Sequence, residues 1–95
     1  MLTVRQTETF KKWLTGLKDA KARARIQVRM DRASLGNLGD HKFFEGIGEM
    51  RIDYGPGYRV YFVQEGRSIV LLLSGGDKST QEKDIQKALK MLKEL

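Results

Sequence analysis

GEMRIDYGPGYRVYFVQEGRSIVLLLSGGDKST, residues 48–80, sets the architecture of this chain. Its runs of apolar and β-branched residues predict three strands separated by two glycine-containing turns. Proline fixes the backbone angle at the first corner of a turn, and glycine accepts the positive φ that follows. Such short connections make neighbouring strands antiparallel. The expected strands are Glu49–Tyr54, Tyr58–Val63 and Ser68–Leu73, and the turns are Gly55-Pro56-Gly57 and Glu65-Gly66.

The order of side chains along the first two strands predicts their register. A two-residue turn at Pro56-Gly57 would place the apolar residues of the first strand on the same face as Arg59. A three-residue loop separates apolar from polar residues, and it is favoured because a one-residue slip reverses every side chain. In this register Gly57 is left-handed and Asp53 lies opposite Arg59. The apolar face then holds Met50, Ile52, Tyr54, Tyr58, Val60 and Phe62, and the other face holds Arg51, Asp53, Arg59 and Tyr61.

Helical periodicity predicts two helices before this sheet and one after it. Thr7 can cap a short first helix, a second is expected from Lys18 to about Leu35, and Ser79 with Glu82 forms a capping-box signature for the last. The third strand is apolar on both faces and should be covered on both sides. We therefore expect one α+β domain over residues 1–95. In it, an N-terminal helical hairpin and a C-terminal helix (80–94) pack on a small twisted antiparallel sheet, with 1–5 as an edge strand and 36–48 irregular.

The bulk composition narrows the classes of function. The chain has 95 residues and no cysteine, which excludes disulfides and cysteine-based zinc sites. It has no apolar run long enough to cross a membrane and no signal peptide, so the expected location is the cytosol. No cofactor or metal site is expected, and His41 is the single histidine.

Positive charge is concentrated at the N-terminal end. The chain carries 18 Lys and Arg against 12 Asp and Glu, a net charge of +6, and residues 1–35 alone hold nine basic and three acidic residues. This balance favours an anionic partner. On the second predicted helix, basic residues recur at steps of three and four, which indicates either a solvated face or a contact with a phosphate backbone. These residues are Lys18, Lys21, Arg25, Arg29 and Arg32.

The candidate chemistry lies on the sheet and just after it. Arginines on a rigid strand are suited to holding phosphate, which makes Arg51 and Arg59 candidates. GGDKS, residues 75–79, lacks the glycine directly before lysine that a P-loop requires. Its glycines are expected to turn the backbone, and Lys78 can face an anion near a helix N-terminus. Tyr61 is a candidate for stacking on an RNA base.

Four segments together resemble the RelE/HigB superfamily of bacterial toxins, in particular the subgroup called addiction module killer proteins. The resemblance covers nearly the whole chain and implies a RelE/ParE-like fold. It also implies the toxin half of a type II toxin–antitoxin module. The segments are QTETFKKWL (6–14), RIQVRMDRASLGNLGD (25–40), EMRIDYGPGYRVYF (49–62) and LLLSGGDKSTQEKDI (71–85).

The resemblance also implies a mechanism and partners. RelE-like members cut mRNA on the ribosome, using the RNA's own 2′-hydroxyl against the adjacent phosphodiester. Arg59 matches the phosphate-holding arginine of the superfamily, Lys78 its basic residue after the last strand, and Arg51 the strand arginine of the subgroup. The implied partners are a small helix-turn-helix antitoxin, mRNA and the ribosome, without a membrane.

The chain departs from the RelE pattern at its C-terminal end. RelE-type enzymes often carry an aromatic residue or histidine there, whereas this chain has no aromatic after Phe62 and no histidine after His41. His41, Glu49 or Tyr61 would have to move protons instead, and the sequence does not choose among them. Two other functions stay open, a ParE-like inhibitor of DNA gyrase that does not cut RNA, and a non-toxic nucleic-acid-binding domain.

Overall fold

The computed structural model describes residues 2–95, so Met1, the first residue of the predicted edge strand, lies outside the described residues. Strand β1 (Thr3–Gln6) comes first, followed by helices α1 (Glu8–Gly16) and α2 (Ala20–Ser34). Four strands follow before a short 3₁₀ turn and the last helix. They are β2 (His41–Phe44), β3 (Ile47–Ile52), β4 (Tyr58–Glu65) and β5 (Ile69–Asp77), then η1 (Lys78–Thr80) and α3 (Gln81–Lys93).

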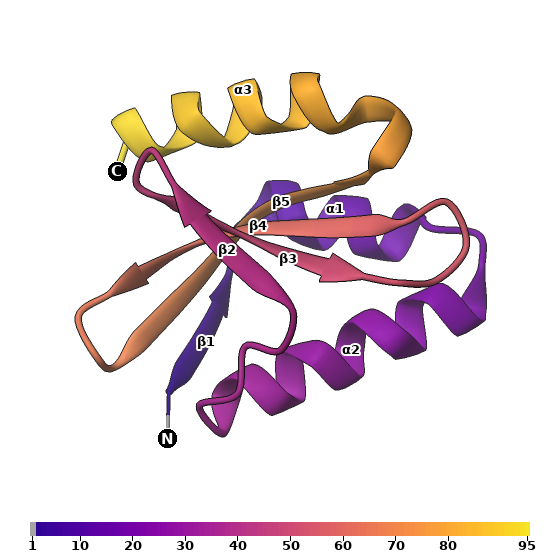
Figure 1. Ribbon diagram of the computed structural model, residues 1–95, viewed down its shortest axis with the longest axis horizontal. Helices are drawn as coiled ribbons and strands as arrows, with labels where there is room; N and C mark the ends of the chain where they lie inside the picture. The colour runs from indigo at the N-terminus through magenta and orange to yellow at the C-terminus, as the bar shows by residue number, and fades with distance from the viewer. Residues whose placement is uncertain (1) are drawn as a thin grey trace.

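The strands form one five-stranded sheet in the order β1-β5-β4-β3-β2. β1 pairs parallel with β5, and the other pairs are antiparallel, so the sheet is mixed where an antiparallel one was expected. Figure 1 shows α3 on one side of the twisted sheet and α2 on the other, with α1 behind the strands. The predicted α+β fold, with its helical hairpin and C-terminal helix on a small sheet, is confirmed.

The β3–β4 hairpin keeps the predicted faces but shifts the predicted register by two residues. Tyr58 pairs with Ile52, so the loop has five residues, 53–57, where three were expected. Tyr54 leaves the ladder because its hydroxyl donates to Asp19 at the start of α2 (3.1 Å). Gly57 is left-handed as predicted, with φ 81°. Asp53 therefore lies in the exposed loop, and the predicted pairing of Asp53 with Arg59 is wrong.

β5 extends further than the sequence indicated. It is an interior strand between β1 and β4, as expected, but it continues through Gly75 and Gly76 to Asp77. These glycines do not turn the chain. They allow close packing, since a Cβ on Gly75 would lie 2.3 Å from the ring of Trp13, and one on Gly76 would overlap the carboxylate of Asp84.

A fifth strand, β2, forms where irregular structure was expected. It pairs with β3 through a two-residue turn, in which Glu45 (φ 52°) and Gly46 (φ 90°) are both left-handed. Two positive φ values define the hairpin turn that best matches the twist of the strands. The sequence did not predict this hairpin because the turn has glutamate at its first position, where asparagine, aspartate or glycine is preferred.

Short polar side chains begin the helices. Thr7 accepts the N–H of Phe10 (3.0 Å), as predicted, and Asp19 accepts N–H groups at the start of α2. At the end of the sheet the cap is Asp77 instead of the predicted Ser79. The Asp77 carboxylate accepts the N–H of Ser79 (2.8 Å), which starts the 3₁₀ turn before α3.

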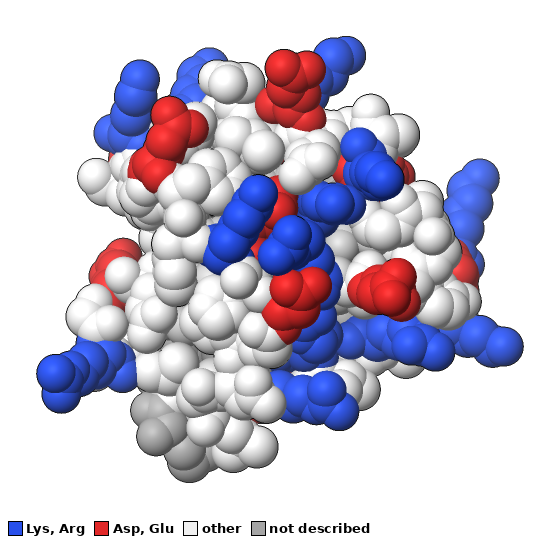
Figure 2. Space-filling model, in the orientation of Figure 1, with Lys and Arg blue, Asp and Glu red and all other residues white. Residues whose placement is uncertain are grey.

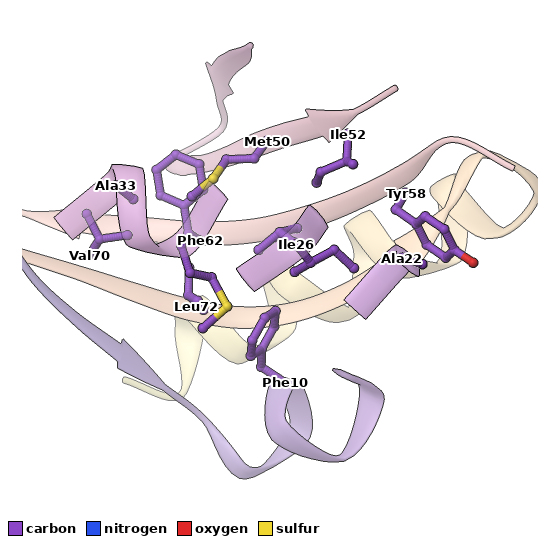
Figure 3. Packing of buried hydrophobic residues seen from close by; sticks show 12 residues of the cluster. Phe10, Ala22, Ile26, Ala33, Met50, Ile52, Tyr58, Phe62, Val70 and Leu72 are labelled. Atoms are coloured by element: carbon purple, nitrogen blue, oxygen red, sulfur yellow. The ribbon is translucent and has the colours of Figure 1, made fainter. Parts of the chain in front are cut away.

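The sheet has an apolar layer on each side. One cluster joins α1 and α2 to the sheet, and Figure 3 shows Ile26 of α2 among the aromatic and aliphatic side chains of this cluster. The other lies under α3 and is built on Ile47, Tyr61, Val63, Leu73 and Ala88. The face that carries the arginines is therefore covered in part by α3.

Gly48 should be one of the positions most sensitive to an added methyl group. It pairs with Phe62, and a Cβ on Gly48 would lie 2.3 Å from the Phe62 ring. Because the ring would have to leave its place in a packed core, we expect Gly48→Ala to lower the free energy of unfolding by about 1–3 kcal/mol. Urea unfolding measures this. Gly16→Ala is the control, since its Cβ would meet nothing within 4 Å, and equal unfolding midpoints would contradict the prediction.

Candidate functional site

Arg51 and Arg59 lie directly opposite each other on β3 and β4, and both side chains leave the sheet on the side of α3. Like charges facing each other across a sheet are destabilising unless other groups compensate them. Each has an acidic neighbour. Arg59 Nε lies 3.8 Å from Glu49 Oε2, and Arg51 Nη2 lies 3.2 Å from Asp40 Oδ1. The structure therefore concentrates two cations at one end of the hairpin.

The guanidinium of Arg59 is held on two sides. Its Nη1 donates to the carbonyl oxygen of Gly57 (2.9 Å), and Glu49 attracts its Nε. The side chain is 14% exposed, and Nη2 receives no hydrogen-bond partner from residues 2–95. A strand and a loop thus fix the group while one edge of its fork stays available to a phosphate oxygen.

Glu49 is a fully buried carboxylate. Its Oε2 accepts a hydrogen bond from Nε2 of Gln81 at the start of α3 (3.0 Å), whereas Oε1 has no partner in the described part of the chain. A buried acceptor without a partner costs free energy, so such a group often serves function instead of stability. The cation of Arg59 offsets part of the cost of burying this charge.

Tyr61 lies opposite Glu49 in the β3–β4 ladder and is fully buried under α3. Burial raises the pKa of Tyr61 well above its usual value, and the nearby Glu49 carboxylate raises this pKa further. The phenol is therefore neutral at physiological pH. Because no surface of its ring is exposed, the predicted role of Tyr61 in stacking on RNA bases is wrong for this conformation.

Lys78 follows β5 at the same end of the sheet as the two arginines. Tyr58 pairs with Asp77, so Lys78 follows directly beside the start of β4. A Cβ on Gly57 would lie 3.4 Å from Arg59 Nη1 and 3.6 Å from the Cβ of Lys78. The three predicted cations, Arg51, Arg59 and Lys78, therefore meet around the β3–β4 loop. Figure 2 shows basic side chains gathered between α3 and α2 on this face, with acidic ones among them.

The basic stripe of α2 is not uniform. Lys18, Lys21, Arg25 and Arg32 are exposed. Arg29 instead points at the chain itself, and its guanidinium donates to the carbonyl oxygens of Leu38 (2.9 Å), Asp40 (3.0 Å) and Arg51. Partial burial lowers the pKa of Arg29. The RNA-binding role predicted for Arg29 is wrong here, because its donors hold the loop before β2.

His41 belongs to the opposite side of the sheet. It pairs with Met50, its ring stacks edge-on with Phe43, and its Nδ1 lies 2.7 Å from the carbonyl oxygen of Gly39. It is therefore separated by the sheet from Arg59. Within residues 2–95 no cluster of three or more His, Asp or Glu side chains has the arrangement of a metal site.

The sequence analysis could place Glu49 at the site but not Gln81. Glu49 has the same parity as Arg51 along β3, so the predicted faces already placed it on the cationic side. No sequence pattern pointed to Gln81, because its contact with Glu49 depends on how α3 packs over the sheet.

No helix in the described residues is long and apolar enough to cross a membrane.

Comparison with known proteins extends this picture. No family model matches the sequence. A protein of Haemophilus influenzae described only as uncharacterized is 47% identical over 95 residues, which covers 99% of this chain and 96% of that protein. The chain belongs to the same family as this Haemophilus protein.

Solved structures show the same fold. A chain of the toxin–antitoxin complex RelBE2 from Mycobacterium tuberculosis superposes with a TM-score of 0.66 and 22% identity, over 81% of this chain and 98% of that one. The conserved hypothetical protein HP0894 from Helicobacter pylori superposes with a TM-score of 0.57 and 18% identity, over 83% and 97%. At these identities the likeness establishes the fold, and function has to be argued from the residues.

Proposed function

We propose that this chain is the toxin of a type II toxin–antitoxin pair, of the addiction module killer subgroup, and that it inhibits translation by cutting mRNA on the ribosome. The observation that carries the proposal is the pairing of a fixed, partly exposed Arg59 with the buried carboxylate of Glu49, 3.8 Å away. The fold shared with a chain of the RelBE2 complex supports the same conclusion. The proposed partner is a cognate antitoxin, a small helix-turn-helix protein.

The reaction needs a phosphate held in place and a proton removed. Arg59 would bind the phosphodiester through the free edge of its guanidinium, with Arg51 and Lys78 steering the strand. Glu49 would take the proton of the 2′-hydroxyl as its oxygen bonds to phosphorus and the P–O5′ bond breaks, and the departing 5′-oxygen would take a proton from water. The products are a 2′,3′-cyclic phosphate and a 5′-hydroxyl end. Preorganised donors stabilise the added charge, and a positioned base contributes separately.

The structure favours Glu49 over the other two candidates for proton transfer. His41 lies on the wrong side of the sheet, and the raised pKa of Tyr61 leaves its phenol neutral. Gln81 covers the carboxylate, so its side chain must rotate away before a hydroxyl can reach Glu49.

The burial of Glu49 beneath Gln81 leads to a second candidate function. Because Glu49 is fully buried, the exposed cations could serve a toxin that binds its target without cutting RNA, such as an inhibitor of DNA gyrase. Such a protein would not depend on a carboxylate beneath its arginine. The two candidates therefore differ in what happens to mRNA inside the cell.

Regulated expression of the chain in bacteria distinguishes them. We expect growth arrest within minutes of induction and new mRNA 5′ ends clustered inside translated codons, mapped by sequencing of 5′-hydroxyl ends. Expression of Arg59→Ala at the same level is the control and should not create these ends. Arrest with intact mRNA and damaged DNA would contradict cleavage and support the gyrase inhibitor.

A further inference from the structure

A shallow groove of about 240 Å³ runs between α2 and the end of β3. Its floor is the apolar Ile52, and its walls carry three cations and one carboxylate. It lies on the α2 side of the sheet, whereas Arg51 and Arg59 leave the sheet on the α3 side. Figure 1 shows these two helices on opposite sides of the sheet. The lining residues are Arg25, Val28, Arg29, Arg32, Ile52 and Asp53.

Two of the three arginines are fixed before any partner arrives. Arg29 is held by backbone carbonyl oxygens, and the guanidinium of Arg25 lies 4.6 Å from the centre of the Tyr54 ring. The side chain of Arg32 is exposed on the rim, where its guanidinium makes no hydrogen bond to any of residues 2–95. Cations that are already positioned lose less side-chain freedom on binding an anion.

An apolar side chain lies between these cations. Val28 is 46% exposed, with Arg25 three residues before it and Arg32 four residues after it on the same helix face. Leu35, one further turn along, is 69% exposed. A surface for a phosphate backbone gains nothing from exposed valine and leucine, whereas an amphipathic protein segment uses apolar anchors and charges together.

We propose that this groove, which we call the α2 groove, docks an acidic amphipathic segment of the antitoxin, with an apolar side chain on Val28 and carboxylates on Arg25 and Arg32. The proposal rests on the proposed function for its partner. Charge complementarity supports it, since Arg25 and Arg32 share the lining with a single carboxylate, Asp53. The third cation, Arg29, already donates to backbone carbonyl oxygens. An RNA strand held by Arg59 would lie on the other side of the sheet, so the α2 groove is free for a second macromolecule.

Two substitutions test the α2 groove in the complex with the protein encoded beside this chain. Val28→Glu places a carboxylate between two arginines, which the folded chain tolerates but an acidic segment does not. Arg32→Glu reverses one rim charge. We expect each to weaken binding of the neighbouring protein by at least about tenfold, measured by calorimetry. Arg67→Glu, on the exposed turn between β4 and β5, is the charge-matched control and should bind like wild type.

The cellular readout separates docking from folding. Val28→Glu expressed alone should arrest growth like wild type, and co-expression of the neighbouring protein should no longer rescue it. Binding within twofold of the control for both variants would overturn the proposal. Loss of affinity for single-stranded RNA without loss of the protein partner would also overturn it, because the α2 groove would then be an RNA contact.

A direct probe covers the case in which no neighbouring protein binds, which would count against the antitoxin in the proposed function. A synthetic helical peptide with leucine at every fourth position and flanking glutamates is titrated into the isolated chain and followed by NMR. We expect salt-sensitive shifts around Val28 that Val28→Glu abolishes. The absence of such shifts in the wild-type chain would overturn the α2 groove itself.

Discussion

Arg59→Ala is expected to remove the toxicity of this chain. The guanidinium is positioned by β4, by the carbonyl oxygen of Gly57 and by Glu49, so alanine removes a preorganised donor from the developing charge on phosphorus. Loss of one such donor typically lowers a rate about 10²–10³-fold. The measurement is the rate of mRNA cleavage in a translation extract with the purified variant.

The same substitution also acts on stability, which the experiment has to separate. Arg59 is the cation beside a buried carboxylate, and removing one member of a buried pair can cost about 3 kcal/mol of unfolding free energy. Two companion variants resolve this. The double variant Glu49→Gln with Arg59→Ala removes the unpaired charge and should recover stability, which would assign the lost stability of Arg59→Ala to that charge.

Arg59→Lys is the second companion. It keeps a positive charge near Glu49 but cannot make two parallel bonds to a phosphate, so it should fold normally and retain partial cleavage. A folded Arg59→Ala protein that cuts mRNA at the wild-type rate would contradict the assignment and move the phosphate site toward Lys78 or Arg51.

The faces of the sheet could be predicted from the sequence because they depend on residue parity. A shift of two residues in the β3–β4 hairpin left every predicted face unchanged, and Arg51 and Arg59 therefore came together as expected. The predicted position of Asp53 opposite Arg59 was wrong because pairing, unlike parity, changes with loop length. In the longer loop the Tyr54 hydroxyl donates to Asp19, a contact between residues 35 positions apart that local pattern does not predict.

The helical cover over the site was harder to predict. Apolar spacing predicted α3 but not which strand residues would lie beneath it, so the burial of Tyr61 and Glu49 was missed. The prediction of a uniformly exposed basic stripe on α2 was wrong at Arg29 for a similar reason. Periodicity placed Arg29 among exposed cations, whereas three carbonyl oxygens from the loop before β2 and from β3 take its donors.

Buried polar atoms concentrate at one place in this fold. Glu49 Oε1, Arg59 Nε, the Tyr61 hydroxyl and the Ser74 hydroxyl are all buried without a hydrogen-bond partner within residues 2–95, and Tyr61 pairs with both Glu49 and Ser74 across the ladder. Packing alone would favour apolar residues at such positions. A cluster of buried polar groups beside a cation is the pattern expected around a carboxylate that takes part in a reaction.

Glu49→Gln should therefore lower cleavage further than any change at the exposed cations. Glutamine keeps the size of the side chain and can still accept a hydrogen bond from Gln81, but it cannot take a proton from a 2′-hydroxyl. Loss of a positioned general base typically lowers a rate about 10²–10⁴-fold. The variant leaves Arg59 without its paired carboxylate, so its unfolding free energy should also fall, by up to about 3 kcal/mol.

Binding of the antitoxin distinguishes a catalytic base from a structural carboxylate. Glu49→Gln should lose cleavage while the antitoxin still binds. Gln81→Ala, which removes the side chain covering Glu49, should keep or increase the rate. Glu65→Gln, the same chemical change at the exposed end of β4, is the control. A Glu49→Gln protein with a normal rate would leave Glu49 as a buried partner of Arg59 and favour the toxin that binds without cutting.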